Sequence, residues 1–419
     1  MKRTPMERGP GAWFSQFPSP LLEVALLRLL SALGAGAVLY LTPMVFHREA
    51  FSASAVGEGL ALAALVGVGG RLLSGLLLDR GISCSWPIGL GLAASLLGDA
   101  VLLGAESQGP YRFGQACLGL AMGLYWPAIE LAVPLACPPL PSAKAFALAR
   151  TADALGVACG SIAGAVLASR GWLRGIYALD IAVLLLMAML LWRSPLPAHP
   201  SRLAAGPAAP STRPARPWLL PLLPLFAVVV LATAVPALMQ SALPLDLVRG
   251  GLRRAPLNES LGALTIGLQL ALLVLLQWPL GRALARRPVV VGLTLSLIAF
   301  AFGTLLLAAS ALLPWGGWLL VGAQLPLAVG AAAFLPTATE AVVQLAPASH
   351  RGVAMALFSQ CFALSALAAP LLGGWLLDRQ GHGAGLWLGL AIALLLGLPL
   401  VARLGQRPTP ATGVSTTPP

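Results

Sequence analysis

Ionisable side chains inside apolar segments are the residues of this chain best suited to do chemistry. Arg28 falls about eight residues into the first apolar segment and Asp153 about ten into the fifth, roughly 12 and 15 Å deep at the rise of a helix. Arg150 precedes Asp153 by three residues and therefore shares its helical face. Burying a charge in lipid is costly, so such residues are candidates for function. A carboxylate beside an arginine can take up and release a proton, which is the chemistry of proton coupling.

The segments that position these residues are apolar and long enough to cross a membrane. The 419-residue chain is 58% hydrophobic and 10% charged, with a mean hydropathy of +0.86, whereas soluble domains are about 25% charged. Twelve segments reach spanning length, six on each side of a stretch at 194–217 that is rich in Pro, Ala and Ser. The sequence thus predicts an all-α, multi-pass membrane protein with a semi-extended linker at 194–217.

The second half of the chain repeats the first at a fixed distance. The matches go beyond Ala and Leu, which coincide easily by chance in so apolar a sequence: Gln115, Pro127, Gly164 and Arg170 recur 209 positions later as Gln324, Pro336, Gly373 and Arg379. Two similar halves are typical of secondary transporters, in which one half rocks against the other. The expected domains are an N-terminal segment at 1–19, helical bundles at 20–193 and 218–404, the linker at 194–217, and a tail at 405–419 that its composition marks as disordered.

Charge distribution indicates the orientation and excludes several functions. The net charge of +12 is spread singly between apolar runs, which argues against nucleic-acid binding. Of the 26 Lys and Arg residues, fifteen fall in tails and loops on the side of the N-terminus and eight on the other side. This bias predicts cytoplasmic termini, and we expect the plasma (inner) membrane. No metal-ligand spacing, nucleotide-binding motif or catalytic set is present, so neither an enzyme nor a cofactor is expected.

A further pattern stands in the loops after the second and eighth segments. It reads Gly75-Leu-Leu-Leu-Asp79-Arg80 in the first copy and Gly281-Arg-Ala-Leu-Ala-Arg286 in the second. Together with the twelve segments and the long central loop, this pattern resembles the major facilitator superfamily. The second copy departs from the superfamily pattern, because Ala285 replaces the aspartate. The resemblance implies two pseudo-symmetric six-helix bundles that transport a small molecule by alternating access, and we expect a functional monomer.

The resemblance places the first and fifth helices side by side, so Arg28 and Asp153 can pair near the membrane midplane. Two interpretations of the pair remain open: proton coupling or substrate contact, with Arg150 beside it, or a static ion pair that holds the bundle together. Gly156, Gly160 and Gly164 have the spacing that brings helices into close contact.

The loop pattern is expected to form a conformational latch, a charged contact that favours one conformation and breaks in the other. Its members are Gly75, Asp79 and Arg80 in the first half, and Gly281 and Arg286 in the second. Glu130 and Glu340 come near the cytoplasmic ends of their spans, and we expect them to pair with Arg80 and Arg286. The alternative is that the charged residues only mark the ends of spans.

Polar and aromatic residues at depth are candidates to line a central cavity: Tyr125, Trp126, Gln240, Gln269 and Gln360. Glutamine also serves as a hydrogen-bonding group between helices. Asp180 is expected to reach water at an interface, and Asp99 has no assigned role. The mostly apolar interior favours proton-coupled efflux of a small organic compound, that is, an antiporter. Uptake of a sugar, carboxylate or nucleoside is the alternative, and a non-transporting sensor or assembly factor is a third.

Overall fold

The computed structural model describes residues 17–140, 142–196, 219–284, 286–347 and 351–405. Twelve helical segments in these residues are long and apolar enough to cross a membrane. Backbone groups have no water to bond inside a bilayer, and a helix satisfies them within one segment. The predicted segments at 1–19, 194–217 and 405–419 lie mostly outside the described residues.

The first bundle is built from six helices: α2 (Ser19–Arg48), α3 (Ala53–Asp79), α4 (Ser85–Leu103), α5 (Gln108–Ala136), α6 (Ser142–Ser169) and α7 (Gly175–Arg193). Within it, α2 packs against α6 and α7, while α5 packs against α3 and α4. The second bundle follows the linker at 194–217.

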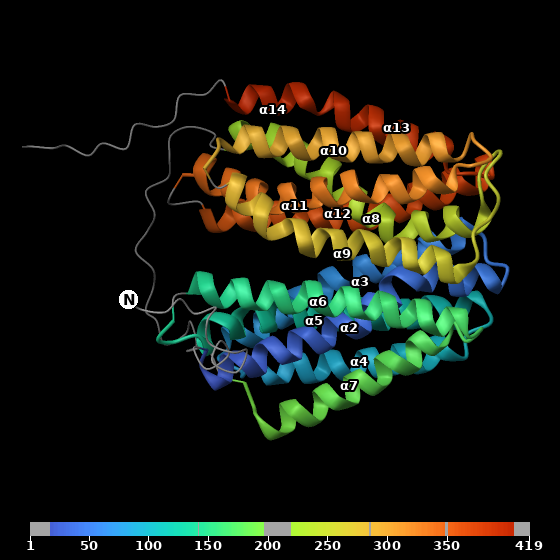
Figure 1. Ribbon diagram of the computed structural model, residues 1–419. Coiled ribbons are helices and arrows are strands. Elements are labelled where there is room, and N and C mark those ends of the chain that lie inside the picture. The colour runs from blue at the N-terminus through green and yellow to red at the C-terminus, as the bar shows by residue number, and fades with distance from the viewer. Residues whose placement is uncertain (1–16, 141, 197–218, 285, 348–350, 406–419) are drawn as a thin grey trace, which may run out of the picture.

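The second bundle contains η2 (Leu220–Leu222), α8 (Leu223–Arg249), α9 (Glu259–Leu284), α10 (Val289–Ser310), α11 (Gly317–Leu345), α12 (Arg351–Gln380), α13 (Ala384–Leu396) and α14 (Leu398–Gly405). Its last span consists of α13 and α14 together. Helix α8 packs against α12, and α11 packs against α9 and α10, which repeats the pairing of the first bundle. The sequence repeat is therefore a repeat of structure, and Figure 1 shows the two bundles side by side.

Glycines set the distance between α2 and α6. A methyl group at Gly156 or Gly160 would collide with the α2 carbonyl oxygens of Leu29 and Leu33. The predicted close contact of this helix is thus confirmed, and its partner is α2. Because Leu29 follows Arg28, this contact also fixes the height at which the side chains of the two helices meet.

The bundles touch each other through α3 with α12, α6 with α9, and α2 with α8. We call the end of the molecule where α2 begins the terminal end, and the other end the opposite end. Polar contacts between the two bundles gather at the opposite end. The Asp378 carboxylate of α12 accepts hydrogen bonds from the backbone N–H groups of Ala53 (2.9 Å) and Ser54 (2.7 Å) at the start of α3. Arg48 of α2 pairs with Glu259 of α9 at the same end.

Candidate functional site

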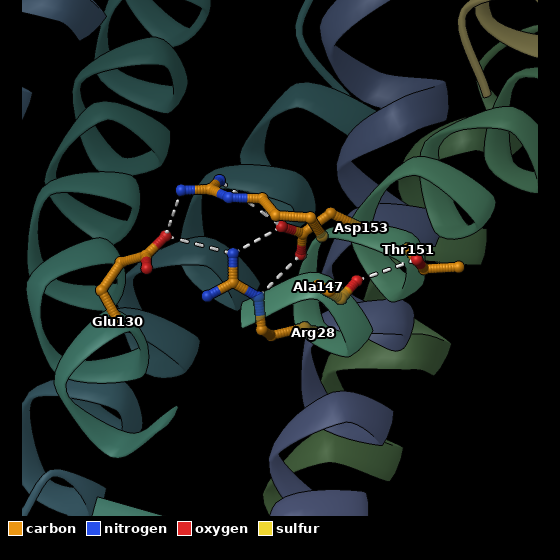
Figure 2. A network of polar contacts seen from close by, with 6 residues as sticks. Arg28, Glu130, Ala147, Thr151 and Asp153 are labelled. Atoms are coloured by element: carbon orange, nitrogen blue, oxygen red, sulfur yellow. Dashed lines mark hydrogen bonds and ion pairs between the residues drawn. The ribbon is translucent and has the colours of Figure 1, made fainter. Parts of the chain in front are cut away.

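The Arg28 side chain of α2 is fully buried (0% exposed) and lies between two acidic side chains. Its Nε donates to Asp153 Oδ1 at 3.0 Å, and its Nη2 approaches Asp153 Oδ2 at 2.5 Å. The same Nη2 donates to Glu130 Oε1 of α5 at 3.1 Å. Figure 2 shows the guanidinium held between the two carboxylates. The structure therefore brings Arg28 and Asp153 together and adds Glu130 to them.

Arg150 completes this group, which we call the Arg28 network: Arg28, Glu130, Arg150 and Asp153. Arg150 Nη2 lies 3.0 Å from Glu130 Oε1, and its Nη1 lies 3.8 Å from Asp153 Oδ2. Two cations thus balance two carboxylates, which lowers the cost of keeping charges in an apolar bundle. The Arg150 side chain is 46% exposed and that of Asp153 is 19% exposed, while Arg28 is not exposed at all. The network is therefore closed on the side of Arg28 and partly exposed on the side of Arg150 and Asp153.

Two further features of Arg28 matter for chemistry. Its guanidinium carbon lies 5.4 Å from the centre of the Trp126 ring, within the range of a cation–π contact. Its Nη1 is buried and has no hydrogen-bond acceptor among the described residues. A buried donor without an acceptor is destabilising, so this atom is a position where an incoming acceptor would be favourable.

A cavity of about 430 Å³ lies between the two bundles. Its lining is mostly apolar: Ala64, Leu65 and Val68 of α3, Phe226 of α8, and Leu357, Cys361, Ala363, Leu364 and Leu367 of α12. Gln360 of α12 lines it as well, and is the one predicted cavity glutamine that does. Because both bundles contribute walls, rocking of one bundle against the other would change the shape of this cavity.

Comparison with known proteins identifies the family. The chain matches the Major Facilitator Superfamily over residues 24–300 and 256–418.

The chain belongs to the Major Facilitator Superfamily.

Solved structures of two transporters resemble this fold. A peptide transporter POT variant in complex with alafosfalin is 17% identical and covers 93% of this chain and 95% of its own, with a TM-score of 0.75. A variant of the nucleoside transporter NupG is 14% identical and covers 92% of this chain and 100% of its own, with a TM-score of 0.76. At these identities the likeness shows the fold. No protein with a curated function matches in sequence.

Membership of the superfamily makes the chain a multi-pass membrane transporter rather than an enzyme. Its two bundles have the architecture that the sequence resemblance implied. Among the residues that the structure describes, no group of three or more His, Cys, Asp or Glu side chains could hold a metal ion.

The superfamily loop pattern lies at the terminal end of the molecule. Asp79 and Arg80 are exposed there. A side chain added at Gly75 or Gly281 would meet open space, so neither glycine lies at a close contact between helices in this conformation. The latch itself remains a prediction.

The expected pairing of Glu130 with Arg80 is wrong, because Glu130 binds Arg28 and Arg150. The position of Glu130 along its segment predicts how deep it lies in the bundle. It does not predict toward which neighbouring helix the side chain points. Glu340 is exposed and accepts a hydrogen bond from Gln344 at 2.9 Å. Among the described residues, it forms no ion pair with Arg286.

Three other predicted cavity residues lie elsewhere. Tyr125 is 7% exposed and belongs to the core of the first bundle, and it does not line the cavity described above. Gln240 of α8 interacts with the Tyr40 hydroxyl of α2, where these helices of the two bundles pack against each other. Gln269 of α9 is buried. Neither of these two glutamines lines the cavity described above.

Sequence reasoning missed Asp378, which binds the start of α3 and also pairs with Arg249 at 3.0 Å. The signal was present, because Gly374-Trp-Leu-Leu-Asp378-Arg379 repeats the pattern of the loop at residues 75–80. A second missed group is the buried pair of Asp246 and Arg254, 3.3 Å apart. Asp246 also accepts from the Trp387 indole at 3.0 Å, and this group fastens the opposite end of the second bundle.

Proposed function

We propose that this chain exports small organic compounds in exchange for protons, by alternating access of a site between its two bundles. The observation that carries the proposal is the Arg28 network. It joins the fully buried Arg28 to two carboxylates that are partly exposed. A proton can therefore reach a carboxylate that neutralises the buried charge of Arg28.

Protonation of Asp153 supplies the coupling step. A proton from water binds its carboxylate, which then no longer carries the charge that holds Arg28. Arg28 and Arg150 both keep their contacts with Glu130, and Arg150 loses only its weaker approach to Asp153. The packing of α6 against α2 near Leu29 then loses one of its attractive contacts, and this change favours a different position of α6.

The cavity indicates the class of substrate. Its walls are aliphatic and aromatic, with Gln360 as a polar group, and its volume of about 430 Å³ suits a small molecule. An apolar or amphipathic compound fits this lining better than a sugar. A second candidate is uptake of an anionic solute, which the unpaired Nη1 of Arg28 and the exposed Arg150 would favour.

We propose further that the terminal end faces the cytoplasm and that the protein works as a monomer in the plasma membrane. The excess of Lys and Arg at that end supports the orientation. The polar contacts between the bundles close the opposite end, which in this orientation faces outward. The described conformation is then inward-facing.

Cysteine labelling in intact cells tests the orientation, in a variant that lacks the five native cysteines. A cysteine replacing Ser107, which is exposed at the opposite end, should react with an impermeant maleimide. One replacing Ser201 should not react until the membrane is permeabilised. The reverse pattern would overturn the assignment.

Flux measurements in proteoliposomes test the coupling. With a panel of amphipathic dyes, Asp153→Asn should abolish accumulation driven by a pH gradient and keep downhill exchange, because Asn resembles the protonated acid permanently. Glu58→Gln is the matched control, since Glu58 pairs with Arg112 at 2.6 Å on the surface of the same bundle. Full gradient-driven accumulation in Asp153→Asn would remove the coupling role. Accumulation in the direction of proton entry would favour uptake over export.

A further inference from the structure

Two buried acids of the first bundle take no part in the Arg28 network. Asp99 of α4 is 0% exposed and Asp180 of α7 is 5% exposed, and these two helices pack against each other. The expectation that Asp180 reaches water is wrong, because its carboxyl is turned toward α2. It lies so close to Gly34 that an added methyl group there would collide with it.

The two carboxyl groups are neighbours that interact electrostatically, on helices that pack against each other. Neither oxygen of Asp99 has a hydrogen-bond donor among the described residues. An ionised carboxylate only accepts hydrogen bonds, so two carboxylates cannot bond to each other. A donor appears at this place only when one of them carries a proton.

Cations that could neutralise the pair are bound elsewhere. Arg174, at the start of α7, pairs with Glu49 at 2.8 Å and donates to the carbonyl oxygens of Leu103 (2.8 Å) and Ala105 (2.6 Å). Within the described residues no basic side chain forms an ion pair with Asp99 or Asp180.

The remaining neighbours add no positive charge. Tyr177 of α7 is hydrogen-bonded to Thr42 at 3.0 Å. Helix α5 brings the Cys117 side chain next to Gly98, and α2 brings Gly34. Helix α6 also packs on α7, but its Arg150 and Asp153 are engaged in the Arg28 network.

We propose that Asp99 and Asp180 form a proton-binding site inside the first bundle, which holds at least one proton in this conformation. Two adjacent negative charges without a cation would be strongly unfavourable at this burial. One bound proton removes a charge and at the same time supplies the missing hydrogen-bond donor. The site is separate from the Arg28 network and does not depend on the proposed export function.

Infrared spectroscopy of the purified protein in lipid nanodiscs, near neutral pH and without substrate or gradient, tests the proposal. The wild-type spectrum should contain the C=O stretching band of a protonated carboxylic acid. The Asp99→Asn/Asp180→Asn variant should lose that intensity, because both changes preserve shape and remove the acid. Glu58→Gln, at an exposed ion pair, should lose carboxylate intensity alone and serves as the control.

Two outcomes would overturn the proposal. One is a wild-type spectrum without any protonated-acid band, which needs no variant to be folded. The other is a double variant that loses only carboxylate intensity, as expected if the pair is ionised or bound to a metal cation. Because no transport is measured, these results are independent of whether Asp153 couples protons to flux.

Discussion

At the scale of single residues, Arg28 is the one buried basic side chain among the described residues of the first bundle. Its guanidinium has no access to water, and three of its hydrogen bonds go to carboxylates on two other helices. Removing one partner of a buried charge pair is more harmful than removing both, because the remaining charge stays desolvated.

Arg28→Gln should therefore destabilise the protein by about 3 kcal/mol, since a buried pair that loses one partner costs about that much. The double variant Arg28→Gln/Asp153→Asn should recover most of the loss. Thermal unfolding in detergent measures both, and Arg112→Gln, at a surface pair, is the control. Additive losses in the double variant would show that Arg28 and Asp153 do not act as a pair.

The sequence identifies this site in part. The depth of Arg28 and Asp153 in their segments, together with the family resemblance, placed them near each other. Glu130 could not be assigned, because its neighbours depend on the rotation of α5 about its axis. The Asp99 and Asp180 pair was beyond the sequence as well, since each is a single aspartate on a different helix and only packing brings them together.

At the scale of helices, the contact of α6 with α2 determines the height of the Arg28 network. Gly156 and Gly160 let the α6 backbone lie directly on α2 carbonyl groups. The helix spacing and the bundle repeat follow from residues that can be recognised in the sequence, which is why the fold was predictable in outline. The pairing of particular helices across the two bundles was not, because every span has a similar apolar composition.

Gly160→Ala should push α6 away from α2, because the added methyl group meets the Leu33 carbonyl oxygen. We expect a loss of about 1–3 kcal/mol, as for other overpacked cores, and a weaker Arg28–Asp153 contact. Gly69→Ala in α3 is the matched control, because a side chain there meets open space. Thermal unfolding of both variants decides: equal melting temperatures would contradict the role of Gly160.

At the scale of the whole molecule, the two bundles are held together at one end by charge. Asp378 lies at the end of α12 and binds the free N–H groups at the start of α3. A carboxylate at a helix N-terminus is favourable through these hydrogen bonds and through the helix dipole. This contact must break whenever the opposite end opens.

Asp378→Asn should shift the conformational equilibrium toward opening at the opposite end. A loss of about 1–2 kcal/mol, typical of a charged cap with its hydrogen bonds, changes the population ratio roughly 5- to 30-fold. Spin labels on the two bundles, with distances from pulsed electron resonance, report this shift, and Glu58→Gln is the control. An unchanged distance distribution would show that the Asp378 contact does not hold the end closed.

The acids of the two inter-bundle seams are distributed unequally. The α3–α12 seam has Asp79-Arg80 at the end of one helix and Asp378-Arg379 at the end of the other. At the corresponding positions of the α6–α9 seam, the sequence has Ser169-Arg170 and Ala285-Arg286. Among side chains, only a carboxylate can bind a helix N-terminus through its charge. The α3–α12 seam has such a carboxylate at each end, whereas the α6–α9 seam has none at the corresponding positions. We therefore expect the rotation axis of the rocking motion to lie nearer α6 and α9, with the larger displacements at α3 and α12.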